Sequence, residues 1–496
     1  MGELLKNILF LSPTPSHPQT QGNRRRIYEV CKRFKQQGYC VHFVWLASEW
    51  RGVIGLDALS AMRDAWDHVH VVPHGGSQDG FAGGLDALWT KGLEDMVNWL
   101  RLNFEFEVVW AHYVLLSKVC DLFEDAETVT VVDTHDVLGD RDAIFKPFGR
   151  KSDFASLTRE EEKRGLFRAD FAVACQPEDE EYFKREYGLQ NTLTIGQIQH
   201  ATAVPERLGG GKTIGFIGSQ NAVNVESLRQ LVAELTAQRD VLPKDFRLRL
   251  AGSMTRGADI NLPDFVEDCG YVDDLAGFYA DADLVVLPLE FGTGLKVKSV
   301  EAVSFGVPVL GTEHAFIGLV SAEPMHRFQT VKDLVQAIPG VLADARERRR
   351  LAAVSREVFA DYQAHTEEQF RTFDRLKGER LAKRTGKICQ FGEGEAPFSG
   401  PFYIYGAGMG GKIVFDALAD EQRDLCMGFL DANKSGGSFC GLPVRAPGQV
   451  PMPERAKIGV IIAIMTLEWK SVAHVLQEAG FASLVSAQRF VVNKMI

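Results

Sequence analysis

The chain of 496 residues is 45% hydrophobic and 24% charged, which is the composition of a globular protein and excludes a disordered one. Its length suits about three domains of ordinary size, and its formal net charge of -11 argues against a nucleic-acid-binding protein. No apolar run is long enough to cross a bilayer, and the eight cysteines lack metal or disulfide spacing, so we expect a reduced, cytoplasmic location.

Residues 1–200 alternate short apolar runs with helical segments. The runs expected to form strands are 7–12, 40–46, 68–72, 107–110, 128–133 and 171–174. After the first run, a helix opens at Gly22 and Asn23 and places Ile27, Val30 and Phe34 on one buried face. This alternation predicts a doubly wound, mainly parallel sheet, in which ligands bind at the carboxyl ends of the strands.

Polar residues stand at the start of that helix, next to the end of the first strand. Gly22 and Asn23, with the run Arg24, Arg25 and Arg26, could approach an anionic ligand there. We nevertheless interpret most of the three arginines as a solvated helix face. A further alternative is contact with an anionic membrane surface, because basic residues continue along this helix.

Histidines follow two later strands of the same half. His112 comes after the strand at 107–110, and the strand at 128–133 ends in the sequence Asp133-Thr134-His135-Asp136. A histidine at a strand end more often satisfies structural hydrogen bonds than takes part in catalysis. From the residues alone, both roles stay open for His135.

Residues 201–385 repeat the alternating pattern after a glycine-rich linker at 203–212. A strand follows the linker, and Ser219 and Asn221 lie in the turn at its end. Asn224 is the expected N-cap of the next helix.

The most informative stretch is 288–311, PLEFGTGLKVKSVEAVSFGVPVLG, which follows a buried strand expected at 284–287. Gly292 and Gly294 allow a sharp turn and leave room for a ligand against the main chain. A helix is expected to begin near 293–295. A glycine loop that leads into a helix N-terminus favours a bound phosphate, because free N–H groups and the helix dipole meet there.

Charged side chains accompany this loop. Lys296 and Lys298 lie in the first turn of the expected helix and would add positive charge beside a phosphate. Glu301 comes three residues after Lys298, on the same helical face. The alternative is therefore an ordinary connection with a surface pair of Lys298 and Glu301.

The whole string resembles the C-terminal signature of glycosyltransferase family 4, whose members are retaining enzymes of the GT-B fold. The resemblance rests on GTGLKVK, on Glu301-Ala302 and on Gly306-Val307-Pro308-Val309. It implies that Glu301 holds the ribose of the donor nucleotide. It also implies that the loop holds the diphosphate, with Lys298 as the source of positive charge.

The family's first glutamate is replaced here by Thr293, so its contact with the donor sugar would pass to Glu290 or to the loop main chain. The loop residues expected to contact the donor are Thr293, Gly294 and Leu295.

Other segments carry weaker parts of the resemblance. FEVVWAHY and the following DTHD resemble the N-terminal half of the family, which implies that His135 faces the donor sugar. FIGSxNxxN resembles the opening of the donor-binding domain, which implies donor contacts by Ser219 and Asn221. The loop around Val272 is similar to the one that the family places beside the nucleotide base.

Two patterns suggest metal sites, and we interpret neither as one. His68 and His70 share one side of a strand, but without a third ligand nearby they make a weak metal site. Asp281-Ala282-Asp283 looks like the DxD motif of metal-dependent glycosyltransferases, but it leads directly into a buried strand and is read as a turn. The family that the chain resembles uses no metal at this position.

Residues 390–496 form a separate strand, glycine loop and helix. Gly406, Gly408 and Gly411 fit the pattern GxGxxG after a short strand, and a second strand ends in Asp431. This spacing predicts a nucleotide or an NAD-like ligand whose ribose is bound by the aspartate. The segment is similar to small Rossmann units found beside sugar-modifying enzymes. The alternative is a glycine-tight scaffold without a ligand.

The sequence thus predicts an α/β protein with a GT-B fold of two Rossmann-like domains and a third, smaller one. The predicted boundaries are 1–200 for the acceptor side, 201–385 for the donor side with a late helix crossing back, and 390–496. The predicted activity is transfer of a sugar from a nucleoside-diphosphate sugar to an acceptor hydroxyl, with retention implied by the resemblance, and without a metal or another cofactor.

Several points stay open at this stage. The acceptor could be a glycan, a lipid-linked glycan or a protein, and the location could be cytoplasmic or peripheral at the inner membrane face. Two other functions are a GT-B-like nucleotide-sugar epimerase and a non-enzymatic nucleotide-sugar sensor. No nucleic-acid partner is expected.

Overall fold

The computed structural model describes residues 6–47, 56–74, 83–123, 128–146, 155–205, 211–256, 260–383, 389–392, 397–465 and 469–495. The linker predicted at 203–212 lies partly outside these residues. The chain divides into two compact units. Unit 1 comprises Met1–Leu93, Phe106–Glu124 and Thr128–Glu379, and unit 2 comprises Glu94–Glu105, Asp125–Glu127 and Arg380–Ile496.

The first sheet of unit 1 has seven strands in the order β3-β2-β1-β4-β5-β6-β7, all paired in parallel. Their bounds are Lys6–Ser12 (β1), Tyr39–Ala47 (β2), His68–Pro73 (β3), Phe106–His112 (β4), Val129–Asp133 (β5), Phe171–Ala174 (β6) and Thr192–Thr194 (β7). Each strand predicted in this half is present. Because the strands are parallel, their carboxyl ends meet at one edge of the sheet.

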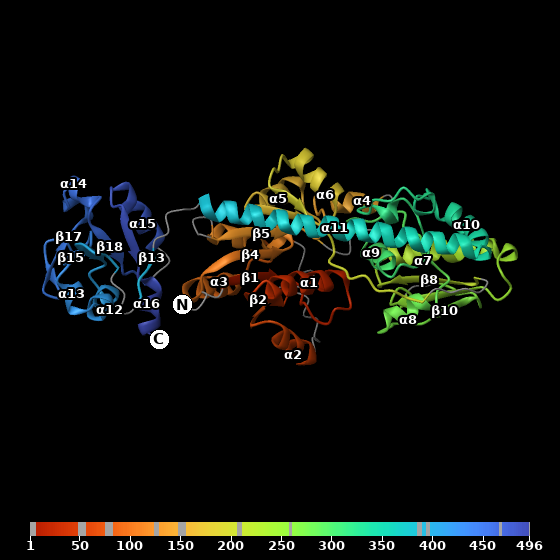
Figure 1. The fold of residues 1–496 in the computed structure, drawn as a ribbon, viewed down its shortest axis with the longest axis horizontal. Helices are drawn as coiled ribbons and strands as arrows, with labels where there is room; N and C mark the ends of the chain where they lie inside the picture. Colours follow the sequence, from red (N-terminus) through yellow and green to blue (C-terminus); the bar gives the residue numbers. More distant parts are fainter. Residues whose placement is uncertain are drawn as a thin grey trace. The chain divides into compact units, whose positions relative to one another are not determined.

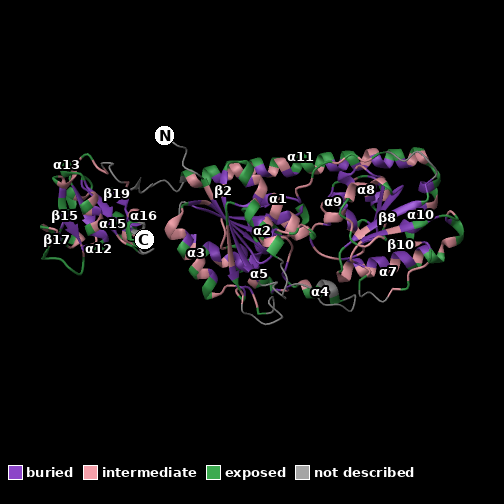
Figure 2. Ribbon diagram, turned by 90° about the horizontal axis from the view of Figure 1, so that it is seen from below, coloured by how far each residue is buried: buried purple, intermediate pink, exposed green. Residues whose placement is uncertain are grey.

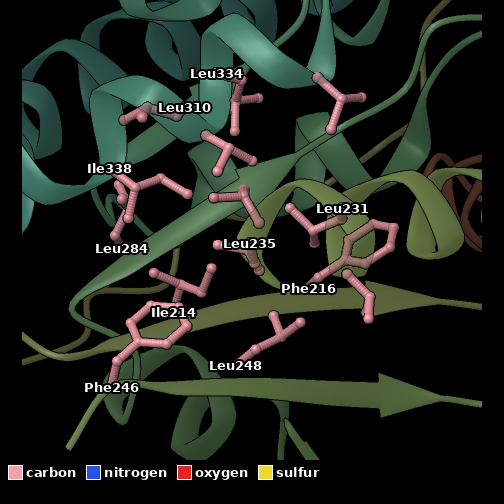
Figure 3. Packing of buried hydrophobic residues seen from close by; sticks show 14 of the residues in the cluster. Ile214, Phe216, Leu231, Leu235, Phe246, Leu248, Leu284, Leu310, Leu334 and Ile338 are labelled. Atoms are coloured by element: carbon pink, nitrogen blue, oxygen red, sulfur yellow. The ribbon is translucent and has the colours of Figure 1, made fainter. Parts of the chain in front are cut away.

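The second sheet of unit 1 has five parallel strands in the order β10-β9-β8-β11-β12. Their bounds are Thr213–Gly218 (β8), Arg247–Gly252 (β9), Val266–Asp268 (β10), Leu284–Leu287 (β11) and Val309–Gly311 (β12). Figure 3 shows the core on one face of this sheet, where Phe216 and Ile214 of β8 pack with residues of two helices, among them Leu231 and Leu334.

Helices separate the strands of unit 1. Those around the first sheet are Gly22–Gln36 (α1), Leu56–Ala65 (α2), Arg141–Phe145 (α4), Arg159–Leu166 (α5) and Pro177–Tyr182 (α6), with a 3-10 helix at Val114–Phe123 and a π-helical turn at Phe183–Tyr187. Those around the second are Ala222–Ala237 (α7), Leu275–Ala280 (α8), Val297–Ser304 (α9) and Val331–Ala343 (α10), with 3-10 turns at Arg239–Val241, His314–Phe316 and Pro324–His326. Helix α3, Lys91–Asn103, begins in unit 1 and lies mostly in unit 2.

The long helix α11, Ala345–Lys383, runs past both sheets of unit 1 (Figure 1). Its second half packs on the first sheet, where the ring of Phe373 contacts those of Phe34 and Trp110. Glu367 of α11 also forms an ion pair with Arg33 of α1, with an N–O distance of 2.7 Å. The helix therefore ties the two sheets of this unit together.

Unit 2 contains a third sheet in the order β13-β19-β18-β14-β15-β17-β16, parallel except for β16. The strand bounds are Cys389–Gln390 (β13), Phe402–Tyr405 (β14), Cys426–Leu430 (β15), Ser438–Phe439 (β16), Leu442–Arg445 (β17), Gly459–Ile462 (β18) and Ser483–Ser486 (β19). The helices are Met409–Ala417 (α12), Asp420–Arg423 (α13), Met452–Arg455 (α14), Trp469–Glu478 (α15) and Gln488–Met495 (α16), with a 3-10 turn at Pro447–Gln449.

The buried residues concentrate on the strands and on the inner faces of the helices (Figure 2). The architecture confirms the predicted α/β class with parallel, doubly wound sheets. Among the described residues, none of the helices combines the length and the apolar character needed to cross a membrane.

Candidate functional site

The carboxyl ends of β1, β4 and β5 bring two predicted site residues, Asn23 and His135, together with Tyr113. Asn23, in the first turn of α1, donates from Nδ2 to the hydroxyl oxygen of Tyr113 at 3.1 Å. The Tyr113 ring stacks on that of His135, with a centroid distance of 4.1 Å. Tyr113 and His135 both have left-handed backbones, with φ of 68° and 60°. Such conformations are costly outside glycine and cluster at functional sites.

A buried ion pair holds this edge of the sheet in place. Arg26 donates from Nε and Nη2 to the carboxylate of Asp133, at 3.0 and 2.8 Å, and both side chains are almost fully buried. The interpretation of the three arginines as a solvated face is therefore wrong for Arg26. It is also wrong for Arg25, which pairs with a residue of the second half. Burial acts to raise the pKa of Asp133, but Arg26 and two histidines hold it well below its usual range.

The two histidines of this edge are in direct contact. His112 Nδ1 lies 3.3 Å from Asp133 Oδ2 and 3.0 Å from His135 Nε2. Because an ionised carboxylate only accepts, the His112 proton is assigned to Nδ1. His135 Nε2 then accepts from it, and the remaining proton of His135 is on Nδ1. Burial lowers the pKa of both histidines, which keeps them neutral at pH 7.

The ligand atoms of His112, Asp133 and His135 lie within 4.8 Å of one another, a spacing that also suits a metal ion. Arg26 already donates to both oxygens of the Asp133 carboxylate. The guanidinium therefore neutralises the one anionic ligand and would repel a divalent cation. This geometry favours an ion pair over a metal centre.

The glycine loop of the second half takes the sharp turn that was predicted. Gly292 and Gly294 have φ of 115° and 65°. Helix α9 begins at Val297, two residues later than the latest predicted start, because Lys296 is its N-cap. Lys296 Nζ donates to the carbonyl oxygens of Gly294 at 2.6 Å and Gly292 at 3.2 Å. Burial lowers the pKa of Lys296 to about 8.

Lys298 is turned toward the end of β8. Its Nζ donates to Oδ1 of Asn224, and burial lowers its pKa to about 7. Asn224 was predicted to be the N-cap of α7, but Asn221 holds that position. The Oδ1 of Asn221 accepts from the Asn224 N–H at 2.8 Å. Ser219 accepts from the Asn224 side chain through its carbonyl oxygen. The predicted donor residues Ser219, Asn221 and Lys298 therefore form one network.

Glu301 is 7% exposed and links the two halves of unit 1. Its Oε2 accepts from Arg25 Nη1 of α1 at 2.7 Å, and its Oε1 accepts from the Tyr279 hydroxyl at 2.9 Å. The alternative of a surface pair with Lys298 is therefore wrong. The arrangement puts a carboxylate and a guanidinium from opposite halves beside the helix that follows the glycine loop.

Further contacts join the same two edges. Thr293 donates from Oγ1 to Asp136 Oδ2 at 2.8 Å. A Cβ on Gly22 would lie 3.3 Å from the Val297 side chain of α9, and one on Gly294 would lie 3.1 Å from the Asp136 carboxylate. We call this contact region between the strand ends of the first sheet and the glycine loop the seam of unit 1.

Three predicted donor residues lie elsewhere or have other partners. Glu290 accepts from the Val331 N–H at 2.8 Å, at the start of α10, so its side chain supports that helix rather than the loop. Leu295 packs near Gly318, with 2.7 Å between its Cδ1 and a Cβ built there. Val272 is half-buried against the core of the second sheet.

The two suspected metal patterns have different outcomes. Asp283 Oδ2 accepts from the N–H groups of Lys212 and Thr213, at 2.9 and 3.0 Å, which agrees with its interpretation as a turn residue. His68 of β3 does have further potential metal ligands nearby, on the neighbouring strand β2. Cys40 and His42 of β2 lie beside His68, with all three ligand atoms within 4.8 Å, because the β2–β3 register pairs His42 with His68. This group lies near the amino ends of the strands, away from the seam.

Asp136, which contacts the glycine loop, and Gln176 and Asp179, which follow β6, were not among the predicted site residues. Part of the pattern that would have identified Gln176 and Asp179 is present in the sequence. The strand at 171–174 was predicted, and polar residues beyond its carboxyl end belong to the ligand-binding edge of a parallel sheet.

In the glycine loop of unit 2, the main chain of Ala407 is bonded to two side chains of the same unit. Asp431 Oδ2 accepts from the Ala407 N–H at 3.1 Å, and Lys434 Nζ donates to the Ala407 carbonyl oxygen at 2.6 Å. Gly408 is the N-cap of α12, and a Cβ there would meet only Lys434 Nζ within 4 Å. A ligand held by Gly406, Gly408, Gly411 and Asp431 stays a prediction.

Comparison with known proteins agrees with this architecture. Residues 211–344 match the family model described as glycosyl transferases group 1. No curated protein sequence matches the chain.

Solved structures of similar fold cover the chain more widely. Sucrose-phosphate synthase from Thermosynechococcus elongatus has a TM-score of 0.55 at 18% identity, covering 75% of this chain and 100% of that one. TarM has a TM-score of 0.57 at 11% identity, covering 76% and 99%. HepE from Anabaena, solved with UDP and glucose, has a TM-score of 0.53 at 14% identity, covering 75% and 100%.

At these identities the structural likeness establishes the fold, which is GT-B with an additional Rossmann-like domain. The residues that match the family model, 211–344, include the five strands of the second sheet of unit 1. Fold and family match together support an enzyme of the sugar-transferase class.

Proposed function

We propose that the protein is a retaining, family-4-like glycosyltransferase that moves a sugar from a nucleoside-diphosphate sugar to a hydroxyl group of an acceptor, in the synthesis of a polysaccharide or glycoconjugate. The observation that carries this proposal is the seam of unit 1. There Glu301 pairs with Arg25, and Thr293 of the glycine loop bonds to Asp136. His135, stacked on Tyr113, belongs to the same edge of the first sheet as Asp136. HepE, which shares the fold, was solved with UDP and glucose, and a variant of TarM from S. aureus with UDP and alpha-GlcNAc-glycerol.

Each part of the seam has a role in this proposal. Glu301 exchanges its bond with Arg25 for the ribose hydroxyls, and the freed guanidinium then faces the diphosphate. The loop N–H groups, with Lys298 behind them, stabilise the negative charge that develops on the leaving diphosphate. His135 donates from Nδ1 to an oxygen of the sugar. Burial of the site limits transfer to water.

The reaction needs no metal in this proposal. Cationic side chains and a helix N-terminus supply the positive charge that a divalent ion supplies in other transferases. The nucleoside-diphosphate sugar is the only cofactor-like molecule required.

A thermal-shift screen with nucleotides and UDP-sugars tests the proposal, since a ligand that binds only the folded state raises the apparent Tm. We expect a UDP-sugar to stabilise the wild-type chain, and Glu301→Ala to lose most of that shift. Product analysis then separates the functions. Formation of an isomeric sugar without an acceptor would indicate an epimerase, and binding without turnover across acceptors would indicate a sensor. Absence of any shift with nucleotides and nucleotide-sugars would contradict the proposal.

A further inference from the structure

Two buried hydrogen-bond acceptors at the end of β6 have no partner in the part of the chain that the structure describes. Gln176 and Asp179 are 4% and 6% exposed. Gln176 Nε2 donates to Asp179 Oδ1 at 2.8 Å, which fixes both side chains against each other. Among the described residues, nothing donates to Gln176 Oε1 or to Asp179 Oδ2. Buried polar atoms are nearly always hydrogen-bonded, so a pair of unsatisfied acceptors indicates a missing donor.

These acceptors belong to the seam. A Cβ built on Gly318 would lie 3.2 Å from Gln176 Oε1 and 2.7 Å from Leu295 Cδ1, so Gln176 stands beside the last residue of the glycine loop. Asp179 interacts electrostatically with Asp136 and with Lys296. The first sheet thus contributes a carboxylate and an amide oxygen next to the loop where Thr293 replaces a glutamate.

The charged residues around Gln176 and Asp179 limit which kind of ligand can bind there. Asp136 and the ionised form of Asp179 would repel an anion. A divalent cation is disfavoured by Lys296, whose ammonium is buried beside them, and by Arg141, which is bonded to Asp136. Lys296 Nζ is already used by the loop carbonyl oxygens. The remaining candidates are neutral donors, which are a water molecule or the hydroxyl groups of a sugar.

We propose that Gln176 and Asp179 bind hydroxyl groups of the transferred sugar, so that the first half of unit 1 supplies the sugar-recognising carboxylate that Thr293 does not. This rests on the proposed function and specifies its donor. The substrate is a nucleoside-diphosphate hexose whose contacted hydroxyls are free. A donor that lacks the contacted hydroxyl leaves the acceptors unsatisfied and binds more weakly.

The test compares UDP with UDP-sugars by isothermal titration calorimetry on the full chain. UDP-glucose, UDP-galactose and UDP-GlcNAc are titrated into the wild type, and the tightest is kept as the probe. Asp179→Asn and Gln176→Ala are then titrated with UDP and with that probe. Glu181→Gln is the matched control, because Glu181 lies on the same helix with its side chain 75% exposed.

We expect the affinity of Asp179→Asn and Gln176→Ala for UDP to stay within twofold of the wild type. Their affinity for the UDP-sugar should fall about tenfold or more. In turnover assays the loss should appear mainly as a higher KM for the donor. A deoxy-sugar donor lacking the contacted hydroxyl should bind the wild type and Asp179→Asn equally.

Two results would overturn the proposal. One is wild-type affinity for the UDP-sugar in both variants. The other is an equal loss of UDP and UDP-sugar binding, which would make the pair merely structural; melting temperatures of the variants identify that case. If the wild type itself binds UDP but no UDP-sugar, the proposed function has failed, and this result is distinct from either of the others.

Discussion

The protein has two glycine loops, and their surroundings differ. The loop at 292–296 in unit 1 is contacted by residues from far away in the sequence, such as Asp136, 157 positions from its partner Thr293. The loop at 406–411 in unit 2 is bonded instead to side chains of the same unit that follow it more closely in the sequence. Asp431 and Lys434 bond to the N–H and carbonyl of Ala407.

The two loops also require their glycines for different reasons. A Cβ on Gly411 would lie 2.0 Å from the Gly406 carbonyl oxygen, and one on Gly410 would lie 2.3 Å from that of Ala463. Tight packing therefore accounts for these two positions without a ligand. Near the first loop, Gln176 and Asp179 keep acceptors for which no described residue is a donor. The comparison teaches that a glycine pattern marks a close approach of the backbone, and that unsatisfied polar groups around it indicate a ligand.

The largest expected effect tests the packing role of the second loop. Gly411→Ala should destabilise unit 2 by about 3 kcal/mol, because its Cβ would overlap a main-chain oxygen. Gly408→Ala is the matched control and should change stability by less than about 0.5 kcal/mol. Hydrogen–deuterium exchange of segment 402–417 in the full chain measures the change in stability in both variants. Equal protection in the two variants would contradict the packing account.

The next effect concerns the carboxylate beside the first loop. Glu301→Ala should weaken donor binding by about 1.5–3 kcal/mol, the usual worth of a hydrogen bond to a charged group. Calorimetric titration with a UDP-sugar measures it. Glu313→Ala, an exposed glutamate of the same half that pairs with Arg327, should bind like the wild type. Unchanged affinity in a folded Glu301→Ala variant would remove Glu301 from the donor site.

The next effect, which is smaller when taken per pH unit, is a pH dependence from Asp179. Burial, with the nearby Asp136, raises the pKa of its carboxyl to about 7 from an ordinary value of 3.8. Between these values the folded state keeps a proton that the unfolded state releases, so this group lowers stability as the pH rises. Asp179→Asn removes the effect and should gain stability over the wild type by about 1.4 kcal/mol per pH unit near pH 5 to 6.

Urea unfolding of the two proteins at several pH values checks this expectation. The difference should level off above pH 7, where Asp179 is ionised in both states. A constant difference from pH 4 to pH 8 would show that the buried carboxyl does not titrate as stated.

The smallest expected effect is that of chelation, which should leave donor turnover unchanged. Arg26 donates to both oxygens of Asp133, and Asp283 Oδ2 accepts from two main-chain N–H groups. The group of Cys40, His42 and His68 lies near the opposite ends of the strands. Loss of activity in EDTA that manganese or magnesium restores would place a metal in the mechanism.

The fold was largely predictable from the sequence, because helix and strand periodicity is a local property. The strand at 171–174 was predicted with its observed bounds, and Ile27, Val30 and Phe34 are buried as expected. Even the glycine loop was found by its local backbone requirement. Helix ends were less certain, since Asn221 and Asn224 are both good N-caps and only the turn geometry selects Asn221.

The partners within the site were not predictable in this way. A run of three arginines is usually solvated, but Arg26 meets Asp133 across 107 positions and Arg25 meets Glu301 across 276. Gln176 and Asp179 follow a predicted strand, yet their burial depends on the second half folding against them. Such pairs are set by tertiary packing, and no periodicity in the sequence records them.

Hydrogen–deuterium exchange of the full chain, with and without the UDP-sugar that stabilises it, tests the central claim most directly. The account predicts slower exchange on binding in segments 21–27, 133–137 and 292–301, with segment 405–412 unchanged. Slower exchange confined to 405–412, with no change along the seam of unit 1, would contradict it.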